Sequence, residues 1–297
     1  MTIRRIGFIG LGVMGLPMAS NLARAGFDVV GYSRTAATRE RFASAGGAIC
    51  ASVSEASRGA EALITMLPDG PDVLEVALGK GGVFENAKPG LIYIDMSTIS
   101  PGTAKDLADE GKRRQIRVLD APVSGGEAGA REAALSIMVG GSVDDFEACM
   151  PVFNAVGKTV IHVGSNGAGQ TVKAANQLIV AGTIELVAEA IVLLEACGNV
   201  DIERAIEVMS GGLAGNRTLE RKTSSMLARD FKPGFRVDLH HKDLGIVLTT
   251  ARTAGAVLPL TAVVSQLMAA LRANGQGSQD HTALFTLVER LSGRSEN

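Results

Sequence analysis

The first candidate for a proton-transfer group is a lysine among small and apolar residues. Lys173 lies within residues 169–177, GQTVKAANQ. A partly desolvated lysine can give up and accept a proton near neutral pH, as general acid–base catalysis requires. If the stretch is helical, Asn176 and Gln177 follow at i+3 and i+4 and share a face with the lysine. For the lysine taken by itself, a solvated or salt-bridged side chain is the more common alternative.

A second stretch offers a place for a small anion. Residues 120–126 read DAPVSGG and follow an apolar, strand-like run. Ser124 presents a hydroxyl, and Gly125 and Gly126 leave backbone N–H groups uncovered, a combination that suits a carboxylate. An ordinary glycine turn without a ligand is the alternative for this stretch.

The third feature is a glycine-rich turn near the N-terminus, in residues 7–19. Gly10, Gly12 and Gly15 have the spacing GxGxxG, directly after the apolar run 6–9 and before an amphipathic pattern that reaches residue 25. The first glycine permits a tight turn, the second admits a pyrophosphate and the third lets the helix pack on the strand. A helix that begins here offers free N–H groups and a positive dipole end to phosphate. The expected contacts with a dinucleotide are Gly10, Leu11, Gly12, Val13, Met14 and Gly15.

The end of the second predicted strand bears on the choice between NAD and NADP. An Asp or Glu about 20 residues after the glycine turn would bind the ribose 2′-hydroxyl of NAD. Ser33, Arg34 and Thr35 stand there instead, and no carboxylate follows the strand. Hydroxyls and a guanidinium suit a 2′-phosphate, so NADP(H) is favoured. In the alternative, Arg34 only stacks on the adenine and both cofactors, NAD(H) included, are accepted.

Residues 231–244, FKPGFRVDLHHKDL, combine charge with aromatic side chains. Lys242 could cover a phosphate or the nicotinamide side of a cofactor, Asp243 could orient Lys173, and Phe235 could wall a pocket. A charged helix start is the alternative. Neighbouring residues on a helix point in different directions, so His240 and His241 are expected to be structural.

Length, composition and charge limit the class of protein. The chain has 297 residues, 46% hydrophobic and 20% charged, with a formal net charge of −2. This favours a folded protein of two domains rather than a disordered chain. A balanced charge gives no overall field for nucleic acid or a membrane surface. The three cysteines and four histidines have no ligand spacing, so we expect no metal site and buried or half-buried thiols in a reducing compartment.

The pattern of elements predicts an α/β fold followed by helices. Strands are expected at 5–9, 28–32, 63–67, 91–95, 118–120, 135–139 and 160–163, and helices in the second half at 169–196, 201–209, 218–227, 238–254, 260–273 and 280–291. Strands that alternate with helices predict a doubly wound, mostly parallel Rossmann-type sheet with right-handed crossovers. The expected domains are residues 1–165 and an all-helical domain, residues 166–297, joined by a long helix.

Two stretches resemble targeting or membrane segments. Glycines interrupt the apolar run after Arg4 and Arg5, so it is interpreted as a first strand rather than a signal peptide. Residues 178–197 are very apolar, but Glu185, Glu189 and Glu195 are costly in lipid. We therefore expect a cytoplasmic protein without a membrane or nucleic-acid partner.

These motifs together resemble the β-hydroxyacid dehydrogenase family, also called the 3-hydroxyisobutyrate dehydrogenase-like family. Residues 7–19 are similar to its cofactor signature, 120–126 to its substrate loop and 167–177 to its catalytic helix, and Lys242-Asp243 match a further pair. The resemblance implies a Rossmann domain, a helical domain, an active site between them and a homodimer or homotetramer formed through the helices.

The resemblance also implies roles for individual residues. Lys173 would be the general acid–base, and Ser124, Gly125 and Gly126 would hold a substrate carboxylate. Thr98 would face both cofactor and substrate, and Leu67 and Pro68 would border the cofactor with Lys242. Asn176, Gln177, Phe235 and Asp243 would line the substrate site. Many members have asparagine where Gln177 stands, so either Asn176 or Gln177 could supply the amide.

The implied reaction is hydride transfer between NADP(H) or NAD(H) and a small 3-hydroxy acid/semialdehyde pair. Residues 64–68, 211–215 and 231–244 resemble one branch of the family in particular, and this resemblance implies tartronate semialdehyde and D-glycerate as the pair. Oxidation of 3-hydroxyisobutyrate and reduction of glyoxylate, succinic semialdehyde or a sulfonated analogue are the alternatives within the family. A non-catalytic dinucleotide-binding protein is the alternative outside it.

Overall fold

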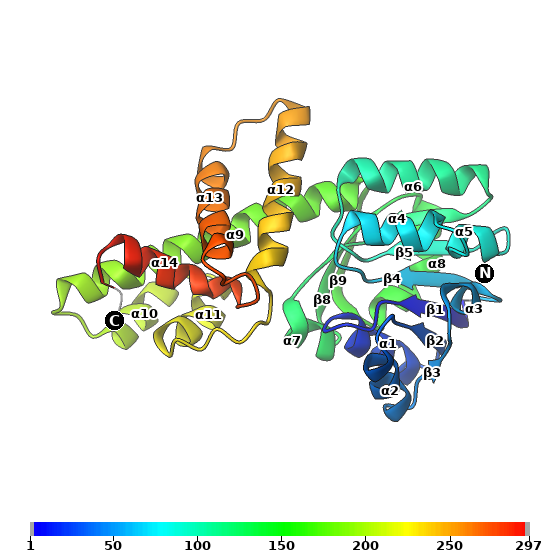
Figure 1. Ribbon diagram of the computed structural model, residues 1–297, viewed down its shortest axis with the longest axis horizontal. Coiled ribbons are helices and arrows are strands. Elements are labelled where there is room, and N and C mark those ends of the chain that lie inside the picture. The colour runs from blue at the N-terminus through cyan, green and yellow to red at the C-terminus, as the bar shows by residue number, and fades with distance from the viewer. Residues whose placement is uncertain (1–2, 295–297) are drawn as a thin grey trace. The chain divides into compact units, whose positions relative to one another are not determined.

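The computed structural model describes residues 3–294 and divides the chain into two compact units, Met1–Lys173 and Ala174–Asn297. The first unit is a mixed sheet with helices on both faces, and the second is built from helices (Figure 1). Both findings confirm the fold class expected from the sequence.

The sheet of the first unit has the strand order β3-β2-β1-β4-β5-β6-β8-β7, and β9 pairs with β8. Strands β1 to β6 are parallel, as is the β8–β9 pair, whereas β8 runs antiparallel to β6 and β7. The strands are β1 (Arg5–Ile9), β2 (Asp28–Tyr32), β3 (Ala48–Ile49), β4 (Ala62–Thr65), β5 (Ile92–Asp95), β6 (Arg117–Asp120), β7 (Val123–Ser124), β8 (Leu135–Gly140) and β9 (Gly157–Gly164).

Alternate residues of the central strands supply two separate cores. In β1, Ile6 and Phe8 belong to one core and Ile9 to the other, and in β4, Leu63 belongs to the second core and Ile64 to the first. Successive side chains of a strand point to opposite faces, so a sheet covered on both sides needs apolar residues at every position. The helices of this unit are α1 (Gly15–Arg24), α2 (Ala36–Ser44), α3 (Val53–Ser57), α4 (Gly70–Leu78), α5 (Val83–Asn86), α6 (Pro101–Arg113), α7 (Gly126–Arg131) and α8 (Val143–Asn154).

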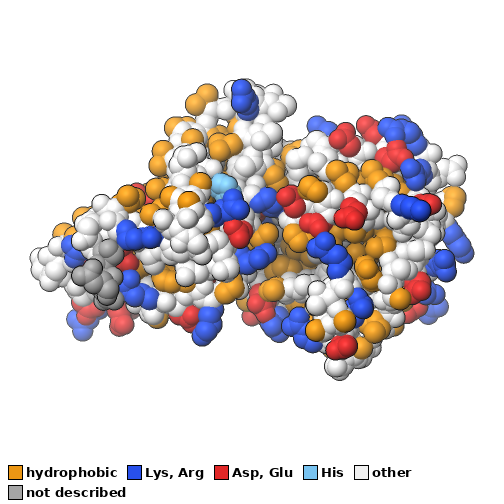
Figure 2. Space-filling model, viewed as in Figure 1, with side chains coloured by type: hydrophobic (Ala, Val, Ile, Leu, Met, Phe, Trp, Pro, Cys, Tyr) orange, Lys and Arg blue, Asp and Glu red, His pale blue; other side chains and the backbone are white. Residues whose placement is uncertain are grey.

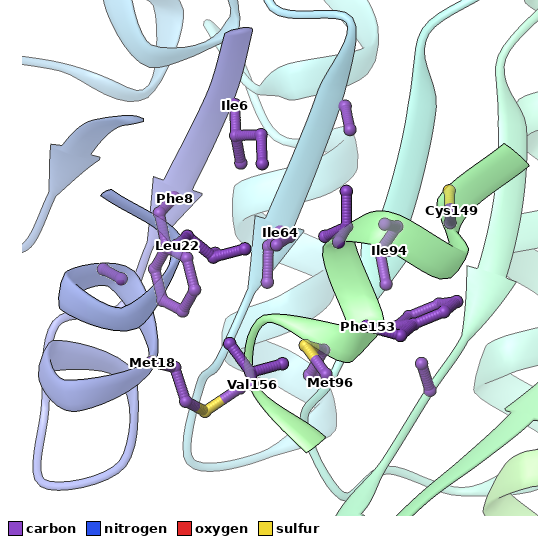
Figure 3. Packing of buried hydrophobic residues seen from close by; sticks show 14 of the residues in the cluster. Ile6, Phe8, Met18, Leu22, Ile64, Ile94, Met96, Cys149, Phe153 and Val156 are labelled. Carbon is purple, nitrogen blue, oxygen red and sulfur yellow. The ribbon is translucent and has the colours of Figure 1, made fainter. Parts of the chain in front are cut away.

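Figure 3 shows the first of these cores, in which α1 and α8 lie against the sheet. Phe8 of β1 lies near Met18 and Leu22 of α1, and Phe153 of α8 lies near Ile94 of β5. All five side chains are fully buried. This packing fixes α1, and with it the glycine turn before α1, against the first strand.

Several predicted boundaries differ from the structure. The fourth strand ends at Thr65 rather than at residue 67, because the backbone N–H of Leu67 leaves the ladder and donates to the Ser97 hydroxyl at 2.9 Å. The two-residue strands β3 and β7 were missed because they are too short to show a periodic pattern. The expected helix 280–291 begins as a single 3₁₀ turn, η1 (His281–Ala283), and Asp280 caps that turn from outside it.

The second unit contains most of a 30-residue helix, α9 (Ala168–Cys197), which begins in the first unit. Its own core joins α9 to the later helices through residues such as Ile184, Val264 and Phe285. These helices are α10 (Ile202–Ser210), α11 (Arg217–Leu227), α12 (Val237–Ala254), α13 (Pro259–Ala273) and α14 (Leu284–Leu291).

Among the described residues, α9 is the one helix with the length and hydropathy of a membrane span. Ala181, Ile184 and Ala188 of this helix are nevertheless fully buried in the protein's own core. Its last residue, Cys197, is exposed, so the expectation that every thiol is at least half-buried is wrong for this cysteine. A helix end that projects from the core leaves its last side chain in solvent.

Charged side chains of both signs are mixed over the visible surface of each unit (Figure 2). No block of one sign stands out on this face, in keeping with the near-zero net charge.

Candidate active site

The glycine turn lies where the strand order reverses, between β1 and β4. Ligands of doubly wound sheets bind at this point, beyond the carboxyl ends of the strands. Gly10 has φ +102°, and a Cβ on it would lie 2.3 Å from the carbonyl oxygen of Met66, in the segment after β4. Only glycine fits there, and residues 66–68 are thereby held against the turn.

The rest of the turn leaves room for an anion. Gly12 is exposed, and a Cβ built on it would meet nothing within 4 Å. Leu11 is fully buried and anchors the turn, whereas Val13 is exposed. Met14 precedes α1 without a side-chain cap, and the first turn of α1 has no acidic residue. Gly15 lies against Gly10, so the helix starts close to the strand. A pyrophosphate fits this arrangement.

The segment after β2 is basic and held in place by a residue that the sequence analysis missed. Arg39 of α2 donates to the carbonyl oxygens of Ser33 at 2.5 Å and of Arg34 at 3.2 Å. Arg34 is exposed and forms a 3.3 Å ion pair with Asp72 of α4. Thr35 precedes α2 and uses no side-chain cap. Arg39 follows Thr35 by four residues, and this i,i+4 spacing, which places an arginine beside the segment 33–35, was a usable signal for this role.

The segment after β5 carries Thr98, which is half-buried and follows the buried Ser97. The hydroxyl of Ser97 accepts from Leu67 N, so the chains after β4 and β5 are tied together. The predicted cofactor contacts Leu67, Pro68 and Thr98 therefore lie in two linked segments of one sheet edge.

The predicted carboxylate loop follows β6. Ser124 ends the short strand β7 and is half-buried, and Gly125 and Gly126 are exposed. The φ angles of the two glycines are +143° and +63°, a region that other residues rarely adopt. The turn needs its glycines, and they leave the backbone beside the serine open.

Lys173 lies on the second turn of α9 and is 6% exposed. Its Nζ donates to the carbonyl oxygen of Val123 at 2.7 Å. Val123 directly precedes Ser124, so the structure places the amine beside the predicted carboxylate loop.

Four further predicted residues are brought together within the second unit. Gln177 is buried, and its Nε2 donates to Oδ2 of Asp243 at 2.5 Å. Lys242 forms a 3.0 Å ion pair with the other oxygen of Asp243. Asn176 donates to Oε1 of Gln177 at 2.8 Å. Asp243 and Asn176 therefore fix the orientation of the Gln177 amide.

Phe235 is half-buried and packs against two buried histidines. Its ring lies edge-on to those of His240 and His281, with centroids 5.4 and 5.5 Å away. The two Nδ1 atoms of these histidines are 2.9 Å apart, and Nε2 of His240 lies 3.2 Å from the carbonyl oxygen of Gln177. If Nε2 of His240 donates to Gln177, then Nδ1 of His240 must accept from Nδ1–H of His281, which requires a neutral His240 ring. Burial and neighbouring His240 lower the pKa of His281 well below its usual value, in agreement with a neutral ring.

Asp280 anchors this cluster, a role that the sequence analysis did not assign to it. Its carboxylate accepts from the backbone N–H groups of Gly234 and Phe235, both at 2.9 Å, and pairs with Lys222 at 3.2 Å. Burial by itself would raise the pKa of Asp280, but the Lys222 ammonium and the hydrogen bonds from Phe235 N and Thr282 outweigh burial and lower the pKa. Asp280 therefore holds the segment that carries Phe235.

The described residues contain no group of three or more His, Cys, Asp or Glu side chains placed to hold a metal ion.

Known proteins are similar to this chain over nearly its whole length. Residues 5–164 match the family described as the NAD binding domain of 6-phosphogluconate dehydrogenase. Residues 167–288 match the family described as "NAD-binding of NADP-dependent 3-hydroxyisobutyrate dehydrogenase".

Among curated proteins, 2-hydroxy-3-oxopropionate reductase of Escherichia coli is 41% identical over 97% of this chain and 98% of its own length. The 2-(hydroxymethyl)glutarate dehydrogenase of Eubacterium barkeri is 36% identical over 98% of this chain and 97% of its own. A solved structure of 3-hydroxyisobutyrate dehydrogenase from Mycobacterium tuberculosis with L-serine has a TM-score of 0.85 and 34% identity, over 96% of this chain and 98% of that one.

The ion pair and hydrogen bonds of Asp280 predict a stability effect that depends on pH. Asp280→Asn should lower the free energy of unfolding at pH 7 by about 3 kcal/mol, since it leaves a partly buried Lys222 without its partner. A carboxylate with a lowered pKa stabilises the fold above its unfolded pKa, near 3.9, and loses this effect as the pH falls towards 2. The difference between the variant and the original protein should therefore shrink from pH 4 downwards, as measured by denaturant unfolding at several pH values.

Asp238→Asn is the matched control, because the Asp238–Arg272 ion pair is about half exposed. Its effect should stay below about 1 kcal/mol. An Asp280→Asn effect of equal size at pH 7 and pH 3 would contradict the assignment.

Proposed function

Because the chain belongs to the 3-hydroxyisobutyrate dehydrogenase-like family of β-hydroxyacid dehydrogenases, we propose that it interconverts tartronate semialdehyde and D-glycerate. It is an NAD(P)-dependent oxidoreductase of this family. The observation that carries the proposal is the position of Lys173, whose Nζ donates to Val123 O directly before the Ser124–Gly126 loop. An acid whose amine contacts the residue directly before a carboxylate site suits a short molecule with a carbonyl next to its carboxylate-bearing carbon.

In this proposal residues 1–165 form the cofactor-binding domain, which also contributes the carboxylate loop Ser124–Gly126, and residues 166–297 form the substrate and self-association domain, which contributes Lys242 to the cofactor. The exposed Gly12 and the uncapped start of α1 fit the pyrophosphate of a nicotinamide dinucleotide. When bound, the nicotinamide supplies or accepts the hydride. Residues 33–35, 67–68 and Thr98 border the remainder of the cofactor in this proposal, and Lys242 covers its nicotinamide side.

In the direction of reduction, protonated Lys173 hydrogen-bonds the carbonyl oxygen of the substrate and gives up its proton as alkoxide charge develops. Catalysis of this kind contributes about 10²–10⁴-fold. In the opposite direction, neutral Lys173 removes the hydroxyl proton. The contact with Val123 O keeps the amine from rotating away.

The other assigned residues bind and orient the substrate. Ser124, Gly125 and Gly126 hold its carboxylate, which fixes the distance from the carbonyl to Lys173. Gln177, oriented by Asp243, supplies an amide to the substrate hydroxyl, and Asn176 is the alternative. Phe235 walls the pocket and excludes water.

The choice of substrate rests on likeness to the E. coli reductase. The names of two other similar proteins give 2-(hydroxymethyl)glutarate and 3-hydroxyisobutyrate as alternative substrates. Exposed Ile179, Leu186 and Leu193, spaced by seven residues on α9, offer an apolar stripe that a second copy would cover in a homodimer or homotetramer. A cytoplasmic location also remains part of the proposal.

The first test is the oxidation of NADPH and NADH with tartronate semialdehyde, glyoxylate, succinic semialdehyde and methylmalonate semialdehyde. We expect tartronate semialdehyde to have the highest kcat/KM. Turnover of only another aldehyde would reject the named substrate and leave the family and Lys173 intact. Cofactor binding without turnover of any aldehyde would favour a non-catalytic dinucleotide-binding protein.

Replacing the lysine tests the assignment of the acid. Lys173→Ala should bind NADPH as tightly as the original protein but lose at least about 100-fold in kcat, because the alkoxide then receives no proton from the protein. Lys158→Ala, which removes an exposed lysine of the same unit, is the control and should keep full activity. More than a tenth of the original rate in Lys173→Ala would defeat the assignment.

Coenzyme preference tests the segment after β2. Arg34→Ala should lower kcat/KM for NADPH about tenfold and leave that for NADH within about twofold, since only the 2′-phosphate takes a charge-assisted hydrogen bond from the guanidinium. Steady-state kinetics with both coenzymes measure the two ratios. Arg58→Ala, an exposed arginine outside the segment, is the control. Equal losses with both coenzymes would mean that Arg34 stacks on the adenine instead.

A further inference from the structure

The carboxylate of Asp120 lies at the start of α9, far from it in sequence. Asp120 is the last residue of β6 and is 2% exposed. Its Oδ1 accepts from the backbone N–H of Gly167 at 2.7 Å, and its Oδ2 accepts from that of Gln170 at 3.0 Å. The first N–H groups of a helix have no partner within it, so a strand residue here supplies the cap.

The surrounding glycines are shaped to admit this carboxylate. A Cβ on Gly140 would lie 2.6 Å from Oδ1 of Asp120, and a Cβ on Gly169 would lie 2.9 Å from Oδ2. Any other residue at either position would press on the carboxylate or on the nearby backbone. The close approach of β6, β8 and α9 therefore depends on these two glycines.

The segment 120–123 positions Lys173 through its first and its last residue. Asp120 fixes the backbone of the helix at Gln170, three residues before the lysine, and Val123 accepts from the lysine Nζ at 2.7 Å. Residues 120–123 thus determine where the helix begins and where the amine of its second turn lies.

The side chain of Gln170 adds a link to the segment after β5. Its Nε2 donates to Ser97 O at 2.9 Å, and its Oε1 accepts from Ile99 N at 3.1 Å. Both contacts flank Thr98. The first turn of α9 is therefore tied to two strand ends by separate hydrogen bonds.

The charge of Asp120 is costly to the fold. Burial raises its pKa to about 6, despite the hydrogen bonds from Gly167 and Gln170 that lower it. With a raised pKa, the folded chain binds more protons than the unfolded one between about pH 4 and 6, so stability falls as the pH rises through this range. An ionised group that costs stability at neutral pH is better explained by placement of the helix than by stabilisation.

We propose that Asp120 is a positioning residue for the proton donor: it caps the first turn of α9 and thereby sets the place of Lys173 beside the Ser124–Gly126 loop. Gln170 assists from the segment that carries Thr98. The inference rests on the acid–base role proposed for Lys173.

Asp120→Asn tests the proposal, because the amide keeps the shape but turns an N–H group towards a backbone donor. We expect kcat to fall at least tenfold, with the Kd for NADPH changed by less than threefold. Hydrogen exchange, which needs no activity, should show the amides of residues 167–173 exchanging at least tenfold faster. Gln170→Ala is a second, milder variant and should produce a smaller change in the same direction.

Asp145→Asn is the control, since it also removes a buried carboxylate of the first unit, one paired with Arg117 at 2.9 Å. It should lower the melting temperature without changing kcat or the exchange at 167–173. The inference is overturned if Asp120→Asn keeps more than half of kcat, or if exchange at 167–173 rises no more than in Asp145→Asn. Full turnover by Lys173→Ala would instead defeat the proposed function, while the exchange result would still decide whether Asp120 holds the helix.

Discussion

Gly169 and Gln170 in the first turn of α9 are buried, and the first backbone N–H groups of the helix need acceptors that the helix itself cannot provide. Asp120 supplies them from the end of β6, and Gln170 joins the same turn to the segment after β5. The position of Lys173 follows from this constraint, because a helix fixed at its first turn carries its second turn with it. The buried charge of Asp120 costs stability, but the carboxylate gives a 30-residue helix a defined start.

The same logic applies along the carboxyl edge of the sheet. Thr65, Asp95 and Asp120 end β4, β5 and β6, and all three are buried. Thr65 donates to Asp95 at 2.8 Å, and Ser97 N donates to the same oxygen at 3.2 Å. Buried polar groups are tolerated where hydrogen bonds satisfy them. Here the bonds also shape the segments in which Leu67, Thr98 and Ser124 lie.

In the second unit, two histidine rings and the buried carboxylate of Asp280 position a residue of α9. Asp280 holds the segment of Phe235, and the His281–His240 pair reaches the backbone of α9 at Gln177. Asp243 then orients the Gln177 side chain. Backbone and side chain of one residue are thus fixed by separate partners, which leaves the amide a single orientation.

The sequence by itself determined the fold class, β1 and β2 to the residue, the glycine turn and the long helix, because each depends on local periodicity and on glycines with local tasks. It also singled out Lys173, Ser124 and Asp243 as candidates. It missed Arg39 although the contacts of this residue are local. It also missed Gln170, Asp280 and the capping of α9 by Asp120, since those contacts join residues 45 to 73 positions apart. Only the tertiary structure decided which buried donor meets which acceptor, because many pairings satisfy the same local pattern and packing selects one.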